Sequence, residues 1–166
     1  MPIFVAPRPD ERGQFLAFLS GQRASLRAAV AGLDAGQLRA RPAAGAMSLG
    51  ALVKHVALDE RRWVVAAVGG RPEGLWPVED PQAEWTLDEA DDVASLVALL
   101  DAVGEETERV VAGVDDLGAP CPMPGAEHWS VRWVLLHVLE ENARHCGHAD
   151  LLREQLDGAT SQDLGS

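Results

Sequence analysis

Residues 130–158 read SVRWVLLHVLEENARHCGHADLLREQLDG, and this stretch decides the fold class. The spacing of its apolar residues predicts one long helix that begins after an N-cap at Ser130. His137, Glu141 and His145 follow one another at intervals of four residues, so they share one face of that helix. Metal-capable side chains on one face of a largely apolar helix are typical of a metal site inside a helical bundle.

Three more helices are predicted upstream, over about 9–33, 48–68 and 86–114, from apolar residues at helical spacing. Ser48 is the expected N-cap of the second helix, and Gly69-Gly70 its end. Thr86-Leu-Asp-Glu89 fits a capping box at the start of the third.

The segments between these helices read as loops. Proline recurs in residues 71–85 and again in 115–129, and Trp76 and Trp85 are expected to hold the first loop against the body. A turn-rich break precedes Ser48, and the tail from about Gly158 is expected to fray. No segment alternates as a strand would. The sequence therefore predicts an all-α, up-down four-helix bundle, with residues 1–166 as a single domain.

Composition excludes several classes of partner. The chain has 166 residues, of which 47% are hydrophobic, and a net charge of −12 with a single lysine, Lys54. Binding to nucleic acid or an anionic membrane needs clustered Lys and Arg, so neither partner is expected. Cys121 and Cys146 are too few for a disulfide framework. With no signal peptide and no apolar run of membrane-spanning length, a cytoplasmic location is expected.

One metal ion can use only part of the polar stripe. Residues eight apart on a helix are separated by about 12 Å along its axis, so the ion takes either His137 with Glu141 or Glu141 with His145. His55, on the second predicted helix, is the expected third ligand. Two imidazoles and a carboxylate suit Zn²⁺, Ni²⁺ or Fe²⁺ and leave positions open for water or substrate. The alternative is an ordinary solvated polar face.

Neighbouring residues suggest how the site is completed. Asp59 lies on the His55 side of its helix and could accept a hydrogen bond from an imidazole N–H. Arg144 and His148 border the stripe, and either could bind a substrate carboxylate, although a salt bridge to a neighbouring acid is an equally good interpretation of Arg144. Cys146 points away from the stripe and is expected to be buried.

Two segments carry a resemblance to a known superfamily. SLGALVKHVALDERRW (48–63) and HWSVRWVLLHVLEENARHCGHADLLRE (128–154) resemble the DinB-like superfamily, and more narrowly its actinobacterial branch of domains of unknown function. The superfamily's motif of a ligand His, one residue and Gly corresponds to His145-Cys146-Gly147. Many members have a further His four residues before the ligand His. This chain has Glu141 at that position, and in this it resembles the mycothiol-dependent maleylpyruvate isomerase. The resemblance implies that His55, Glu141 and His145 bind one divalent metal, with His137 beside the site.

The resemblance also implies an activity. The superfamily contains S-transferases that use mycothiol or bacillithiol, so we expect a metal-dependent enzyme, with zinc the most suitable ion, that transfers a low-molecular-weight thiol to an electrophilic substrate. A metal-dependent hydrolase and a non-catalytic metal or small-ligand binding protein are the alternatives. Superfamily members often pair through their helices, and five Trp residues could anchor an interface, so a homodimer is expected.

Overall fold

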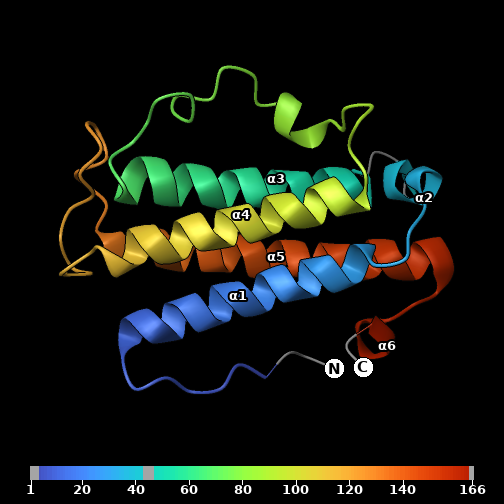
Figure 1. Ribbon diagram of the computed structural model, residues 1–166, viewed down its shortest axis with the longest axis horizontal. Coiled ribbons are helices and arrows are strands. Elements are labelled where there is room, and N and C mark those ends of the chain that lie inside the picture. The colour runs from blue at the N-terminus through green and yellow to red at the C-terminus, as the bar shows by residue number, and fades with distance from the viewer. Residues whose placement is uncertain (1–3, 43–46, 165–166) are drawn as a thin grey trace.

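The computed structural model describes residues 4–42 and 47–164, and the protein is all-helical over these ranges (Figure 1). No β-strand occurs within them, which confirms the all-α class. A π-helical segment, η1, continues α3 without a break, and a short 3₁₀ turn, η2, interrupts the connection to α4. The elements are α1 (Glu11–Val30), α2 (Ala35–Arg39), α3 (Leu49–Arg61), η1 (Arg62–Val68), η2 (Ala83–Trp85), α4 (Val93–Ala112), α5 (Val131–Asp157) and α6 (Ser161–Leu164).

The long helices α1, α3, α4 and α5 pack side by side around an apolar interior. α1 packs chiefly against α5 and α4, and α3 packs against the same two helices. The α3–α5 groove and the α1–α4 groove therefore lie on opposite sides of the molecule. Leu26, Leu52 and Leu100 lie in the apolar cluster nearest α2, while Val64 and Leu135 belong to a second cluster toward the other end. None of the helices in the described ranges combines the length and apolarity needed to cross a membrane.

Successive long helices do not simply alternate in direction. In the first half of α3, Lys54 pairs with Asp91, which lies just before α4. At the end of α3, Arg61 pairs with Glu106 in the second half of α4. The two helices therefore run parallel. The connection over residues 69–92 returns along the outer side of α3 (Figure 1). The prediction of strict up-down alternation is wrong at this point, because a connection this long can span a whole helix whereas only a short loop forces antiparallel neighbours.

Serine caps start α3 and α5 as the sequence predicts. Ser48 Oγ accepts a hydrogen bond from the Ala51 N–H at 3.2 Å, and Ser130 Oγ accepts one from the Trp133 N–H at 3.2 Å. α5 ends before Gly158, whose φ of 79° is the left-handed conformation that glycine adopts without strain. The helix carrying the polar stripe is therefore set at both ends by its own sequence.

The predicted helix start at Thr86-Leu-Asp-Glu89 is wrong. α4 begins at Val93, where the Asp92 carboxylate accepts a hydrogen bond from the Ser95 N–H at 2.7 Å. The Asp92 N–H donates in return to Ser95 Oγ at 2.9 Å. In the first box the Thr86 hydroxyl donates instead to the Gln82 carbonyl at 2.9 Å, and a tertiary contact holds the residues around it in a turn.

That contact comes from Lys54 on α3. Its Nζ donates to the Thr86 carbonyl at 3.0 Å and pairs with the carboxylates of Asp88 at 2.8 Å and Asp91 at 2.9 Å. The end of the connection is thereby fixed against α3 as a turn. Structure also occurs in two other places where none was predicted, since α2 forms within the break after α1 and α6 within the predicted frayed tail.

A buried polar network joins the long helices. Glu60 on α3 accepts hydrogen bonds from Arg23 Nη1 of α1 at 2.5 Å, from Thr107 Oγ1 of α4 at 2.8 Å and from Asn142 Nδ2 of α5 at 3.0 Å. Each of these residues is at most 5% exposed. A buried carboxylate needs such partners, and satisfying it from each of the other long helices favours one register of all of them.

Candidate functional site

Two histidines meet across the α3–α5 groove. The rings of His55 on α3 and His145 on α5 have centroids 5.2 Å apart and lie nearly perpendicular, at 78°. Their side chains are only 13% and 11% exposed. The helices run antiparallel here, and each His faces inward because it continues the apolar face of its own helix. The predicted pairing of these two residues across neighbouring helices is thus present.

Both imidazoles have a buried nitrogen without a partner. Nδ1 of His55 and Nδ1 of His145 are inaccessible to solvent and make no hydrogen bond. Burial, with contributions from His145 and Arg62, lowers the pKa of His55 to about 4. Burial also lowers the pKa of His145, against the opposing charge of Glu141. Both rings are therefore neutral near pH 7, the form in which imidazole offers a lone pair to a cation.

Glu141 lies one turn before His145 on the same face of α5. Its Oε2 is 3.7 Å from His145 Nε2, close to the separation of roughly 3.4 Å expected for two donors bound to one tetrahedral zinc ion. The other oxygen, Oε1, accepts a hydrogen bond from Arg144 Nη1 at 3.2 Å. This carboxylate is therefore close enough to share a cation with His145 while Arg144 holds it from the solvent side.

The connection between α3 and α4 covers the histidine pair. The Trp85 ring stacks on the His55 ring at a centroid separation of 3.7 Å, and it lies 5.9 Å from the His145 ring. Lys54 holds the chain immediately after Trp85, which explains how a loop residue reaches this position. Trp85 therefore shields the two imidazoles from water on the loop side.

Glu84 is the carboxylate beside His55. Its Oε2 lies 3.3 Å from His55 Nδ1, although the two atoms are not aligned as a hydrogen bond. Its Oε1 accepts a hydrogen bond from Arg62, which also pairs with Asp59. Burial raises the pKa of both carboxyls, against the opposing charge of Arg62. Asp59, the predicted acceptor for an imidazole N–H, pairs with Arg62 and has His137 as an electrostatic neighbour, whereas the carboxylate beside His55 is Glu84.

The two residues proposed to bind a substrate carboxylate lie at the outer edge of the site. Arg144 is 56% exposed and pairs with Glu140 at 3.5 Å as well as with Glu141. This is the salt-bridge arrangement that was the alternative interpretation. The exposed His148 ring has its centroid 5.6 Å from that of His145. His148 thus adjoins the buried pair from the solvent side.

His137 belongs to an aromatic cluster instead of the histidine pair. Its ring stacks on Trp133 at 5.2 Å and meets the Trp63 ring edge-on at 4.6 Å. Trp63 also contacts Trp76 at 5.3 Å and Trp129 at 5.0 Å. The α3–α5 groove therefore has histidines and carboxylates toward one end and indole rings toward the other.

The described residues contain no formed metal centre. In the ranges 4–42 and 47–164, no group of three His, Cys, Asp or Glu side chains is spaced to hold an ion. His55, Glu141 and His145 are neighbours with the right donor chemistry and neutral rings, and His145 Nε2 lies 3.7 Å from Glu141 Oε2, so the donor set fits a divalent cation. Cys146, next to His145, is not part of that set: its Sγ faces the Gln22 carbonyl at 3.5 Å, and burial raises its pKa to about 12.

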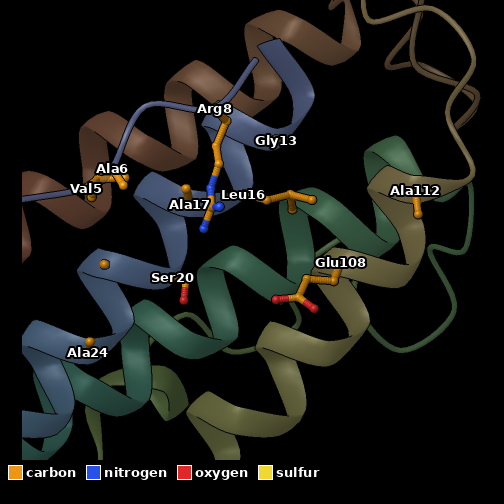
Figure 2. Close-up of a pocket in the computed structure, with 11 residues that line it drawn as sticks. Val5, Ala6, Arg8, Gly13, Leu16, Ala17, Ser20, Ala24, Glu108 and Ala112 are labelled. Atoms are coloured by element: carbon orange, nitrogen blue, oxygen red, sulfur yellow. The ribbon is translucent and has the colours of Figure 1, made fainter. Parts of the chain in front are cut away.

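Among the cavities in the described part of the chain, two bear on the position of the site. One, of about 660 Å³, lies between the N-terminal segment, α1 and α4 (Figure 2), on the opposite side of the molecule from the histidines. Small residues such as Ala17 line it, and Figure 2 shows the Arg8 side chain extending past Ala17. The other, of about 430 Å³, lies beneath the connection over α3 and is lined in part by Arg62 and Glu84. The second cavity therefore adjoins the candidate site.

Sequence reasoning missed Glu84 and the stacking of Trp85. Trp85 was expected to hold its loop against the body, which it does, but no pattern indicated that its target was His55. The available signal was the pair Glu84-Trp85 itself, an acidic and an aromatic residue within a proline-rich loop. Loop residues without periodicity cannot be assigned to a partner helix from sequence alone.

Comparison with known protein families identifies the family of the chain. The protein family described as mycothiol-S-transferase matches residues 14–158, which is most of the chain. The match includes α3, the covering connection and α5, so every residue discussed above as part of the site lies inside it. No curated protein matches the chain.

Proposed function

We propose, from the premise that this chain belongs to the mycothiol-S-transferase family, that it transfers a low-molecular-weight thiol of the mycothiol type to an electrophile with the help of a divalent metal. The observation that carries the proposal is the buried, neutral His55–His145 pair with Glu141 beside it. We further propose that α1, α3, α4 and α5 form the four-helix bundle that the DinB-like resemblance implies.

His55, Glu141 and His145 are the residues that would hold the ion. A zinc-like ion bound there would favour the thiolate form of a thiol near neutral pH. The protein's own residues prepare the site for this chemistry. Burial keeps both imidazoles unprotonated, Glu84 and Arg62 restrain the His55 ring, and Trp85 excludes water from the loop side.

The reaction is a substitution that needs no oxidant or reductant. The thiol sulfur forms a bond to an electrophilic carbon, the bond from that carbon to the leaving group breaks, and the leaving group departs with the electron pair. The thiol proton goes to solvent. With 1-chloro-2,4-dinitrobenzene the products are a thioether, chloride and a proton. Holding the nucleophile as thiolate is the main requirement, since the thiol form is a much weaker nucleophile.

Elemental analysis of the purified protein tests the metal assignment. His145→Ala is expected to lose stoichiometric metal, and a chelator is expected to lower the Tm of the unsubstituted protein because the ion binds the folded state. His137→Gln is the matched control and is expected to keep its metal. Full occupancy in His145→Ala, or loss of metal in His137→Gln with retention in His145→Gln, would show that the ligand assignment is wrong.

A conjugation assay tests the activity. Mycothiol, or cysteine as a simpler thiol, is mixed with 1-chloro-2,4-dinitrobenzene or monobromobimane, and the enzyme is expected to accelerate thioether formation. His55→Ala is expected to abolish the acceleration. Turnover of an ester substrate without any thiol would instead indicate a hydrolase, and metal-dependent stability without either activity would indicate a binding protein.

A further inference from the structure

The cavity of about 430 Å³ beneath residues 74–84 has no role in the site as described so far. Its volume is within the range of small-molecule pockets, which are roughly 300–1,000 Å³. The connection forms its outer wall and α3 its inner wall. It therefore lies on the loop side of α3, beside the residues that restrain His55.

One wall of the cavity is apolar and includes an indole ring. The apolar residues that line it are Leu58 of α3 and, from the connection, Leu75, Trp76, Pro77 and Val78. Trp76 is itself held in place by edge-on contact with Trp63 at 5.3 Å. A fixed indole beside aliphatic side chains favours a planar apolar group, because flat π-systems pack well against both.

The charged residues of the cavity select against anions. Arg61 is paired with Glu106 at 2.7 Å, and Arg62 is paired with both Asp59 and Glu84. The other charged lining residues, Glu79 and Asp80, are acidic. Each arginine that faces the cavity is thus already neutralised, so a carboxylate-bearing ligand would meet negative charge without a free cation to bind it.

The cavity adjoins the histidine pair through a single side chain. Glu84 lines the cavity and also places Oε2 3.3 Å from Nδ1 of His55. The Glu84 carboxylate therefore lies between a ligand in the cavity and the His55 ring.

We propose that this cavity binds the electrophilic co-substrate and selects uncharged, planar aromatic electrophiles. The inference rests on the proposed thiol-transferase function for the identity of the ligand as a co-substrate. The apolar wall of Leu58 and Trp76 holds the ring, and the edge toward Glu84 carries the reacting carbon.

Binding of 1,3-dinitrobenzene, which lacks a leaving group, tests the site without thiol or metal. Its affinity is measured by saturable quenching of tryptophan fluorescence. Trp76→Leu is expected to weaken binding roughly two- to tenfold, the effect of losing one aromatic contact. Leu58→Phe retains the indole but occupies cavity volume, and it is also expected to weaken binding. The anion 2,4-dinitrobenzoate is expected to bind more weakly than 1,3-dinitrobenzene.

Ala17→Leu is the matched control, because it fills the α1–α4 cavity of Figure 2 and should leave the affinity unchanged. The proposal is overturned if the unsubstituted protein does not bind 1,3-dinitrobenzene, or if it binds 2,4-dinitrobenzoate more tightly. It is also overturned if Ala17→Leu weakens binding of 1,3-dinitrobenzene while Leu58→Phe does not. Failure of the thiol-transferase function is distinguishable from these outcomes, since it would show as absent conjugation while the Leu58→Phe and Trp76→Leu effects on probe binding persist.

Discussion

His55 shows how one buried side chain can make stability depend on pH. Its pKa is about 4 in the folded protein, chiefly because burial disfavours the charged ring, against an ordinary value of 6.5. Between these values the unfolded chain binds more protons than the folded one, so lowering the pH favours unfolding. The contribution is therefore complete above pH 6.5 and is lost as the pH falls to about 4, with an upper limit of about 3 kcal/mol.

Urea unfolding of the chelator-treated protein between pH 7 and pH 4 measures this effect. His55→Gln is expected to lose less stability over that range than the unsubstituted protein. Asp59 and Glu84 have raised pKa values and act in the opposite direction, but they are present in both proteins and largely cancel in the comparison. Parallel pH profiles for the two proteins would contradict a depressed pKa at His55.

Glu84 is expected to influence metal affinity without binding the metal itself. Its carboxylate lies 3.3 Å from His55 Nδ1 but is not aligned as a hydrogen bond. A small rotation of the ring on metal binding would let Nδ1–H donate to Glu84, and such a partner orients the ring and raises the basicity of the other nitrogen. Glu84→Gln is expected to weaken zinc binding by about tenfold, the lower end of the effect of such partners. Competition with a zinc indicator measures it, with Asp80→Asn on the same loop as the control. Equal zinc affinities for the Glu84 and Asp80 variants would show that Glu84 does not orient His55.

At the scale of whole elements, Glu60 decides how the helices fit together. Removing its carboxylate leaves the guanidinium of Arg23 buried without an anion. Glu60→Ala is therefore expected to lower the free energy of unfolding by about 3–5 kcal/mol. Glu106→Ala breaks a pair that joins α3 to α4 at the surface, and it is expected to cost less than about 1 kcal/mol. Urea unfolding that gave equal losses for the two variants would mean that the buried network does not stabilise the fold.

The sequence predicted some element boundaries correctly, and the reasons are local. Ser48, Ser130 and Gly158 act through their own backbone neighbours, so their effect is readable from a short window. The start of α4 depends on Lys54, which is distant in sequence, and this contact overrode a valid local signal at Thr86. The π-helical η1 was also not predicted. Its residues Val64–Val68 are all buried, so they show no helical periodicity from which a change of pitch could be detected.

At the scale of the whole molecule, the site was predictable where it depends on helix faces. The pairing of His55 with His145, and the proximity of Glu141, follow from residue spacing together with the resemblance to the DinB-like superfamily. The parallel course of α3 and α4 was not predictable from spacing, and it is what brings Glu84 and Trp85 over the histidines. The partners of a loop residue are set by the path of the chain between helices and not by local spacing. The positions of Glu84 and Trp85 over the histidines could therefore be identified only from the structure.

Self-association remains a prediction, and exposed apolar side chains are the positions at which it can be tested. The net charge of −12 opposes pairing only weakly in physiological salt, because screening limits its range to about 8 Å. Trp63, Trp76 and Trp129 are engaged within one molecule, whereas Phe18 on α1 and Leu136 on the adjacent α5 are 39% and 51% exposed. Phe18 also lines a small hollow with Leu139, one turn after Leu136, so these side chains lie where α1 meets α5, at a surface that a second copy could cover.

We therefore expect sedimentation at micromolar concentration to give twice the 17.7 kDa mass of the chain. Leu136→Arg is expected to return the protein to the monomer mass, because it would place a charge in the apolar contact and a second one, by symmetry, opposite it. Ala98→Arg, at an exposed position of α4, adds the same charge away from that face and should leave the mass unchanged. A mass of 17.7 kDa for the unsubstituted protein across the concentration range would show that the exposed residues of α1 and α5 do not hold a dimer together.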